Sequence, residues 1–575
     1  MAQLLDLAPE LLVNILHHLS YQDLLRSLTV CHRFFDVISK TPELDYQIHL
    51  QVAGLWDNPD CSLPIRTRLS LLQKQEEAWH FFKPLALSKM PVPDIPSGLF
   101  DLSPTTFSIG MATNEDTFET DGIEFFQLPS ELEGSPAKEP LSWTFVKTGM
   151  IIVEYCLSIE ANDLFIAVVS TPDDDVPMTQ HLSALILQYS TKAPHVLARR
   201  PILHLCTVTE EHKGMPSVGL DVSRENLAVS IVFQDPEIRI AASSLCVFNW
   251  RTGEAKTDPM ARQIPIFCTS LVFLTDDILI NPNPFRPSID IYHIRPSGSS
   301  SPDLRVRLIH SLYLPPLLQT TGSRVFISNI SCISRPGAAS TFPRFTQQDR
   351  PFAPDPANAV IPFVIAAHRE DFTRQTFAMV AHRKSLLDLV PWHRLYSDDD
   401  PGVPFFQGLR SNIPPNLCSM QSWDSWGPPV TRWFSGRHLS TPYITCVSGS
   451  RYVQYVTHDL SQNAGGFPGA GERDTISIMD FNPAVVKIAR QRKWEEKGLD
   501  YAEIKIFDGE GSDDALCPAG GVFASDVVGK LPFVQCKSLS RWDFDEVLMC
   551  QDHLLGLKNV PGTFRVGELA IMHFR

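Results

Sequence analysis

The residue types that most often perform chemistry are present in this chain, but not at the spacings that chemistry needs. None of the 12 cysteines forms a C-x-x-C pair, and no set of paired cysteines and histidines stands at the spacing of a zinc site. They stand singly in apolar runs, as free buried thiols do in a reducing compartment. No G-x-S-x-G, H-E-x-x-H, EF-hand or Walker sequence occurs, although triads and paired carboxylates need only proximity in space. We therefore predict no catalytic residue, no metal site and no cofactor.

Three segments could bind a ligand or partner instead. Residues 465–471 are glycine-rich, but they lack the P-loop lysine and do not open a helix, which favours a flexible loop. Trp423, Trp426 and Trp433 could form an aromatic binding surface, although packing between sheets is the favoured interpretation. A helix predicted from Asn482 to Lys497 is basic and could dock an acidic partner, but a solvated helix between strands is favoured. Its cations are Lys487, Arg490, Arg492, Lys493 and Lys497.

Composition limits the partners and the architecture. The chain has 575 residues, of which 43% are hydrophobic and 20% charged, with a net charge of −16. It exceeds a single compact core, so we expect two or more domains or one large repetitive one. The negative charge gives no reason to expect nucleic acid as a partner. Proline is excluded from helix interiors and central strands, so the 46 prolines predict many short elements separated by turns.

The sequence also bears on the compartment. No run approaches the roughly 18 apolar residues of a membrane span. The N-terminus lacks the pattern of a secretory signal, and the C-terminus carries no lipidation motif. We therefore expect a soluble protein of the cytoplasm, the nucleus or both, with no membrane partner.

The first 45 residues predict three short helices. Pro9 can occupy the first turn of a helix, Ser20 with Asp23 resembles a capping box that starts the second, and Thr41-Pro42 ends the third. So small a unit buries too little surface to be stable without help. Adjacent apolar residues on nearly every turn give each helix more apolar surface than its neighbours can cover, which implies a partner. The apolar residues at helical spacing are Leu12, Ile15, Leu16, Leu19, Leu24, Leu25, Leu28, Val30, Cys31, Phe34, Val37 and Ile38.

This segment resembles an F-box. Residues 7–12 are similar to the usual opening, Leu-Pro-x-Glu-Leu-Leu, with Ala8 inserted between the leucine and Pro9. The remaining positions fall in register over the whole motif, at Ile15, Leu16, Leu19, Asp23, Leu24, Leu25 and Val30 to Phe34. The alternative interpretation is an ordinary helical hairpin at the N-terminus of a larger enzyme.

The resemblance implies a substrate receptor of an SCF-type cullin–RING ubiquitin ligase. In that family the F-box binds the Skp adaptor, which links it to the cullin and RING subunits. The C-terminal domain captures a protein for ubiquitination and proteasomal degradation, and the receptor itself performs no bond chemistry. The adaptor-binding residues that the resemblance implies are Leu7, Pro9, Leu12, Ile15, Leu16, Leu19, Leu24, Leu28, Val30, Cys31 and Phe34.

Two further helices follow, at about 42–54 and 63–82, and we expect them to form a stiff linker. Their spacing resembles the segment that follows the F-box in a large group of fungal F-box proteins. We therefore divide the chain into F-box helices at 1–45, a helical linker at 46–89, and a recognition domain at 90–575.

From about residue 90 the pattern changes from helical to alternating. Three units each pair a buried strand with a strand that alternates apolar and polar residues, followed by a turn: 163–169 with 185–189, 226–232 with 245–250, and 277–280 with 289–294. A repeat of roughly 40 to 50 residues built only from strands is typical of β-propeller blades. The predicted fold is therefore a small all-α N-terminus followed by a large all-β domain, a seven- or eight-bladed β-propeller. A pair of β-sandwiches is the competing fold.

The target protein cannot be identified from the sequence. We expect the loops at 335–358 and 461–474, which are long and polar, to contact it. Because the protein is acidic, we expect a basic or neutral target segment, unless Arg432 and Arg437 converge to bind phosphate. Two other function classes stay open: an adaptor-bound scaffold without a ubiquitination substrate, and a propeller enzyme such as a hydrolase. A cluster of carboxylates or histidines at the central opening would indicate the enzyme.

Overall fold

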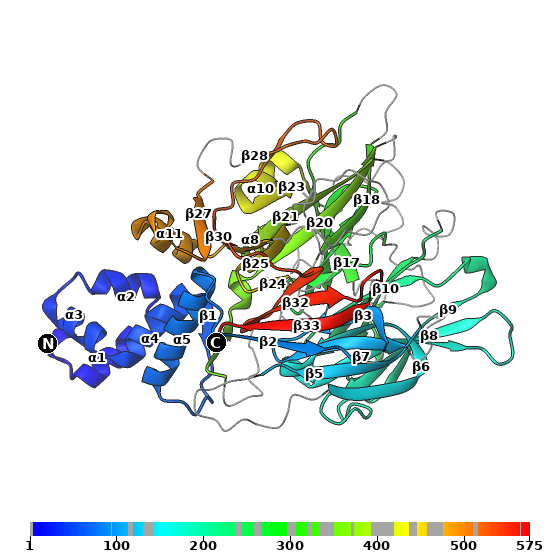
Figure 1. The fold of residues 1–575 in the computed structure, drawn as a ribbon, viewed down its shortest axis with the longest axis horizontal. Coiled ribbons are helices and arrows are strands. Elements are labelled where there is room, and N and C mark those ends of the chain that lie inside the picture. Colours follow the sequence, from blue (N-terminus) through cyan, green and yellow to red (C-terminus); the bar gives the residue numbers. More distant parts are fainter. Residues whose placement is uncertain are drawn as a thin grey trace.

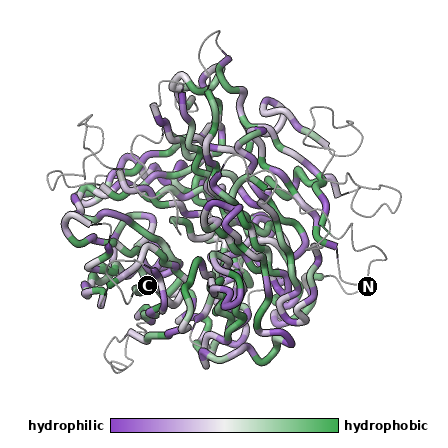
Figure 2. Tube along the Cα trace, turned by 90° about the vertical axis from the view of Figure 1, so that its right-hand side faces the viewer, coloured by the Kyte–Doolittle hydropathy of each residue, from purple (hydrophilic) through white to green (hydrophobic). Residues whose placement is uncertain are grey.

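The structure is a computed structural model of the chain. It describes residues 4–575 except 94, 113–118, 130–142, 236–242, 258–265, 296–305, 320–324, 333–349, 370–372, 393–418, 436–445, 457–474, 498, 510–515 and 564. The first five α-helices gather at the N-terminal end of the molecule, and sheets with a few short helices such as α10 and α11 make up the rest (Figure 1). Viewed from the end furthest from those helices, hydrophobic and hydrophilic segments alternate along the chain (Figure 2).

The helices begin where their capping residues predict. Ser20 accepts a hydrogen bond from the backbone N–H of Asp23 and starts α2, while Pro9 and Pro42 occupy first turns. The N-terminal helices are η1 (Leu4–Asp6), α1 (Pro9–Leu16), α2 (Tyr21–Ser27), α3 (His32–Lys40), α4 (Pro42–Val52) and α5 (Ile65–His80).

The strands form consecutive antiparallel sheets, each from neighbouring parts of the chain. The first sheet has seven strands and divides at the long strand β6 into two blade-sized units. Its strands are β3 (Pro96–Leu102), β4 (Thr106–Ala112), β5 (Thr120–Gln127), β6 (Trp143–Ser158), β7 (Leu164–Pro172), β8 (Gln180–Gln188) and β9 (Ile202–Val208).

Each of the next sheets forms one blade-sized unit, and these units are numbered along the chain from the third to the seventh. The third contains β10 (Ser217–Ser223), β11 (Asn226–Val232), β12 (Ser244–Asn249) and β13 (Glu254–Ala255). The fourth contains β14 (Val272–Phe273), β15 (Ile278–Asn283), β16 (Ser288–Ile294) and β17 (Val306–Tyr313), with β22 (Ser419–Gln421) added in parallel at its edge. The fifth contains β18 (Val325–Cys332), β20 (Val360–Arg369), β21 (Arg374–His382) and β23 (Thr431–Ser435).

The sixth unit contains β24 (Val447–Ser448), β25 (Arg451–Val456), β26 (Thr475–Asp480), β30 (Phe533–Ser538) and β27 (Ala502–Phe507). The seventh joins β31 (Glu546–Met549), β32 (His553–Asn559) and β33 (Val566–His573) to β2 (Ala86–Pro91). Outside these units lie β1 (Leu55–Asp57) with β19 (Phe352–Pro354), the hairpin of β28 (Leu516–Cys517) and β29 (Val527–Val528), α6 (Ile159–Asn162), α8 (Arg383–Asp388), α10 (Trp423–Val430), α11 (Pro483–Gln491), η2 (Glu210–His212), η4 (Pro356–Asn358) and η6 (Trp494–Glu496).

The hydrophobic clusters close these seven units into a ring. Each cluster combines residues of neighbouring units: the first with the second, the second with the third, the third with the fourth and the fourth with the fifth. Another cluster combines residues of the sixth and seventh units with Val360 and Val380 of the fifth unit. A further cluster packs the seventh against the first, through residues such as Phe107 and Leu555. A ring of antiparallel blades is a β-propeller, so the prediction of that fold is confirmed.

The repeat units predicted from the sequence fall at the centres of blades. They correspond to the strand pairs β7–β8, β11–β12 and β15–β16. Packing also explains the three tryptophans, since Trp423, Trp426 and Trp433 are at most 5% exposed. They lie in the cluster between the fourth and fifth blades, which confirms packing between sheets as their role.

Two local predictions were wrong. The loop expected at 335–358 ends in β19, which pairs with β1 beside the helices, so residues 352–354 are not available to a target on a free surface. The helix predicted to reach Lys497 ends at Gln491, where Lys493 adopts a left-handed conformation (φ 49°) and η6 follows. Arg432 is 4% exposed, so its side chain is scarcely accessible to a phosphate in solution. Arg437 and residues 461–474 lie outside the described residues.

The domain boundary expected at residue 90 falls inside β2, which pairs along its whole length with β33. We propose that the folding unit of the body begins with the helices. A chain truncated to start at residue 90 loses α5 and most of β2, so we expect poor solubility and a broad thermal transition. A chain starting at residue 42 keeps α4, α5 and β2 and should unfold cooperatively. Circular dichroism melts and gel filtration test this, and equal melts of the two proteins would contradict it.

Candidate functional site

The core of the helical domain is small. Leu16, Leu24, Ile38 and Leu44 are each at most 3% exposed and come from four different helices. Gln47 of α4 donates hydrogen bonds to the backbone carbonyls of His17 and Leu19, which holds the end of α1 against α4. Each of the four helices thus contributes only one or a few apolar side chains to buried positions, and other apolar side chains remain at the surface.

The structure divides the predicted adaptor-binding residues into three groups. Leu12, Leu16 and Leu24 are at most 3% exposed and serve as core. Ile15 (43% exposed) and Val30 (67% exposed) face solvent, as does Pro9. The half-buried members are Leu7, Leu19, Leu28, Cys31 and Phe34. The solvent-facing residues can therefore contact a partner directly, and the half-buried residues can do so in part.

Three exposed apolar residues were missing from the predicted site. Leu11 (50% exposed), Leu25 (44%) and Phe35 (51%) each stand next to a more deeply buried partner in the sequence, namely Leu12, Leu24 and Phe34. Adjacent residues on a helix point about 100° apart, so one member of a doublet can enter the core while the other faces solvent. The doublets were visible in the sequence, but which member is exposed depends on how the helices pack.

Comparison with known proteins agrees with this geometry. The family model described as F-box-like matches residues 4–51, which span η1 to α4. The N-terminal helices are an F-box-like domain. No curated protein is significantly similar to the chain in sequence.

Several solved structures are similar in part. One is the WD40 domain of SCAP from fission yeast, 11% identical, with 85% of this chain and 94% of that chain covered at a TM-score of 0.32. Another is a luciferin-regenerating enzyme, also 11% identical, with 48% of this chain and 88% of that chain covered at a TM-score of 0.24. The order of the sheets and the packing between neighbouring units show the propeller fold.

α5 attaches the F-box-like domain to the propeller through an apolar contact. The ring of Trp79 stacks on Phe574 near the C-terminus, with centroids 3.8 Å apart and planes 7° apart. Phe82 packs edge to face against the ring of Phe574, with ring centroids 6.0 Å apart. All three side chains are at most 4% exposed. The helix is therefore part of the core that it shares with the sixth and seventh blades.

A buried ion cluster holds the side of α5 that faces the sixth blade. Arg451 lies between Glu76 of α5 and Asp480 of β26, and its Nε donates to Asp480 at 3.1 Å. Burial alone would raise the pKa of Asp480, but Arg451 and His80 hold it below its usual value. Asn482 continues the contact by donating to the backbone carbonyl of Val52 at the end of α4.

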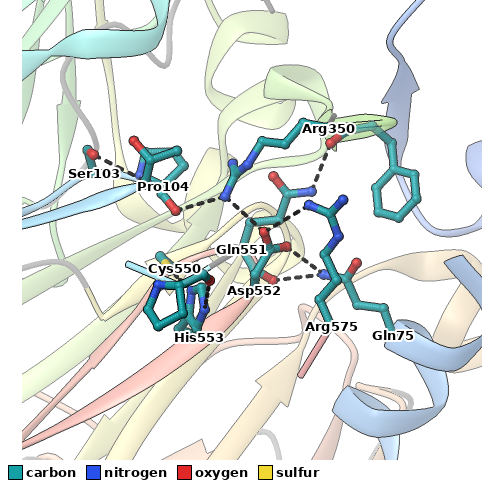
Figure 3. A network of polar contacts seen from close by, with 12 residues as sticks. Gln75, Ser103, Pro104, Arg350, Cys550, Gln551, Asp552, His553 and Arg575 are labelled. Carbon is teal, nitrogen blue, oxygen red and sulfur yellow. Dashed lines mark hydrogen bonds and ion pairs between the residues drawn. The ribbon is translucent and has the colours of Figure 1, made fainter. Parts of the chain in front are cut away.

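A second cluster centres on Asp552, in the turn between β31 and β32 (Figure 3). Its carboxylate accepts from Arg350 at 2.8 Å and from Gln75 of α5 at 3.0 Å, and Arg575 lies 3.6 Å away. Arg350 also donates to the backbone carbonyl of Pro104 in the first blade. One carboxylate thus joins α5, the first blade, the last blade and the C-terminus.

His553, which follows Asp552 in the chain, is buried and neutral. Burial lowers the pKa of His553 to about 3, against the opposing effect of Asp552. Its Nε2 lies 3.0 Å from the backbone carbonyl of Pro129, and its Nδ1 faces the sulfur of Cys550 at 3.4 Å. Burial alone would raise the pKa of Asp552, but the positive charges of Arg350 and Arg575 hold it below its usual value.

Within the described part of the chain, no group of three or more His, Cys, Asp or Glu side chains is placed to hold a metal ion. None of the helices in that part is long and apolar enough to cross a membrane.

Trp79→Ala should weaken the joint between α5 and the propeller. The substitution removes a large buried ring, which typically costs about 3–5 kcal/mol of unfolding free energy. The control is Trp392→Ala, because Trp392 is 37% exposed and its loss should cost far less. Urea unfolding followed by circular dichroism measures both. Equal losses in the two variants would contradict the role of Trp79.

Acid should destabilise the folded protein partly through His553. Its folded pKa lies below its unfolded value of about 6.5, so the unfolded state binds an additional proton as the pH falls from about 6.5 towards 3. The free energy of unfolding then falls by up to about 1.4 kcal/mol per pH unit. His553→Gln cannot bind this proton and should flatten the pH dependence between pH 6 and 4.5, as measured by denaturant unfolding. Identical slopes in the variant and the natural protein would contradict this.

Proposed function

We propose that this protein is a substrate-recognition subunit of an SCF-type ubiquitin ligase. In this role the F-box-like domain binds the Skp adaptor, which links it to the cullin and RING subunits, and the propeller holds a target protein in the cytoplasm or nucleus. The observation that carries the proposal is the exposed apolar surface of the matched domain, to which Leu11, Ile15, Leu25, Val30 and Phe35 contribute. Exposed apolar residues gathered on so small a domain are typical of a protein interface.

The arrangement of the two domains supports this role. In an antiparallel blade, turns alternate between the two ends of the strands, so the turn after the first strand lies at the opposite end from the turn after the second. α5 contacts the turns after the first strands of the sixth and seventh blades, at Arg451 and Gln551. The β7–β8 turn follows a second strand and therefore points to the opposite end, away from the helices (Figure 1). The same alternation places the β15–β16 turn of the fourth blade at that end.

This opposite end offers a surface for a target. Val176 and Met178 in the β7–β8 turn are 52% and 74% exposed, and Phe285 in the β15–β16 turn is 60% exposed. Asp174 and Asp175 lie exposed beside the first pair. Apolar side chains next to carboxylates support a basic or neutral target segment over a phosphorylated one. The contribution of such a receptor is proximity, which brings a target lysine near the charged ubiquitin-conjugating enzyme.

Adaptor binding should depend on the exposed apolar residues of the F-box-like domain. We expect Ile15→Asp with Val30→Asp to abolish co-purification of Skp and cullin, because truncations at interface hot spots cost about 2 kcal/mol or more and a buried unpaired charge costs further. The melting temperature should stay close to that of the natural protein, since both side chains face solvent. Immunoprecipitation from cells with quantitative mass spectrometry measures the recovery.

Two controls separate contact from folding. Met178→Asp places the same charge at an exposed apolar position of the propeller and should leave adaptor recovery unchanged. Leu24→Ala removes a fully buried side chain and should lower recovery together with the thermal stability of the helices. If the double variant retains Skp at natural levels, the F-box-like domain does not use this surface.

Target binding should depend on the end of the propeller away from the helices. Met178→Ala with Phe285→Ala should reduce the recovery of ubiquitinated partners after proteasome inhibition and leave Skp recovery intact. The matched control is Val196→Ala with Leu197→Ala, two exposed residues in the turn between β8 and β9, at the end near the helices. An unchanged set of captured proteins in the first variant would place the target surface elsewhere.

A further inference from the structure

A small polar cavity lies at the joint between the helical domain and the propeller. It lies between the end of α4, α5, and the first turns of the sixth and seventh blades. The lining includes Gln75 and Trp79 of α5 together with Met549, Cys550 and Gln551 of the last blade. Gln551 is 7% exposed and the other four at most 2%. Solvent therefore scarcely reaches these five residues, whereas other lining residues such as Ala53 and Pro354 are half-buried.

Two amide oxygens at this cavity have no hydrogen-bond donor among the described residues. They are Oε1 of Gln75 and Oε1 of Gln551. Their orientation is fixed by the other end of each amide. Nε2 of Gln75 donates to the carbonyl of Gln551 and to Asp552, both at 3.0 Å, and Nε2 of Gln551 donates to the carbonyl of Phe352 at 3.0 Å. Flipping either amide would set oxygen against oxygen, so both Oε1 atoms must find a donor elsewhere.

The size of the cavity limits the donor. The centre of a water molecule can occupy about 20 Å³ of the space, and one internal water needs roughly 10–15 Å³ by this measure. The space therefore takes one or two water molecules and no larger ligand. Buried polar groups in proteins are almost always hydrogen-bonded, to protein or to ordered water.

We propose that this cavity binds one or two internal water molecules, which donate hydrogen bonds to the side-chain oxygens of Gln75 and Gln551. The joint between the F-box-like domain and the propeller is then completed by bound water as well as by direct contacts. A metal ion is disfavoured because the cation Arg451 is among the lining residues, and hard cations require six or more oxygen ligands. The proposal does not depend on adaptor or target binding.

Hydroxyl-radical labelling of the full-length protein tests this. Brief X-ray irradiation splits water into radicals that oxidise methionine and cysteine nearby, so a buried side chain is labelled only where bound water lies beside it. Met549 and Cys550 are 0% exposed and line the cavity. The matched internal controls are Met379 and Met479, which are also 0% exposed but do not line it. We expect Met549 to be oxidised at least tenfold faster than Met379 and Met479. Equal rates would overturn the proposal.

A variant and a crystal structure give independent readouts. Ala53→Leu adds bulk to a residue that lines the cavity and should lower labelling of Met549 to the level of Met379, with an unchanged circular dichroism spectrum. Labelling that persists in a folded variant would overturn the assignment of the label to this cavity. In crystals of the natural protein we expect a density peak within hydrogen-bonding distance of both amide oxygens. An anomalous peak at this position after a rubidium soak would show a monovalent cation instead and would overturn the proposal.

Discussion

The pairing of β2 with β33 is the interaction on which the rest of the structure depends. Six consecutive residues of β2 pair with the last strand of the chain, so the ring closes only when both ends of the body have met. α5 runs directly into β2, and closure therefore also fixes where the helical domain sits. The stacking of Trp79 on Phe574 and the cluster around Asp552 both join these two ends. Contacts so distant in sequence are costly to form early in folding, which makes the last blade the natural point of weakness.

The joint between the two domains relies on buried charge to a degree unusual for a protein core. Asp552 and Asp480 are 4% and 5% exposed, and each is compensated by arginine. Replacing one partner would leave an uncompensated buried charge, which is far more damaging than losing a surface ion pair. Because the partners come from α5, three blades and the C-terminus, the charges are satisfied in one arrangement of the domains. The geometry of this joint is therefore specified more sharply than an apolar contact alone would specify it.

This geometry separates two surfaces that must act together in a receptor. The F-box-like helices, which carry the exposed apolar residues, lie at one end of the molecule, and the β7–β8 turn lies at the other (Figure 1). Neither surface requires a catalytic group. A rigid spacer between an adaptor and a target can raise reactivity through orientation alone, and a ring of blades with a docked helix is a suitable spacer because neighbouring units bury each other's faces.

The sequence by itself determined the classes of structure, because they follow from local periodicity and turn chemistry. The helical doublets before residue 45, the strand pairs at the centres of three blades, and the buried role favoured for Trp423, Trp426 and Trp433 were all predictable. Only the tertiary structure decided which member of a doublet faces solvent: Leu16 and Leu24 are buried, whereas Leu11 and Leu25 are exposed. It also placed β2 in the last blade and α5 in the core. These outcomes depend on contacts between residues hundreds of positions apart, and no local pattern records which distant surface will cover a given side chain.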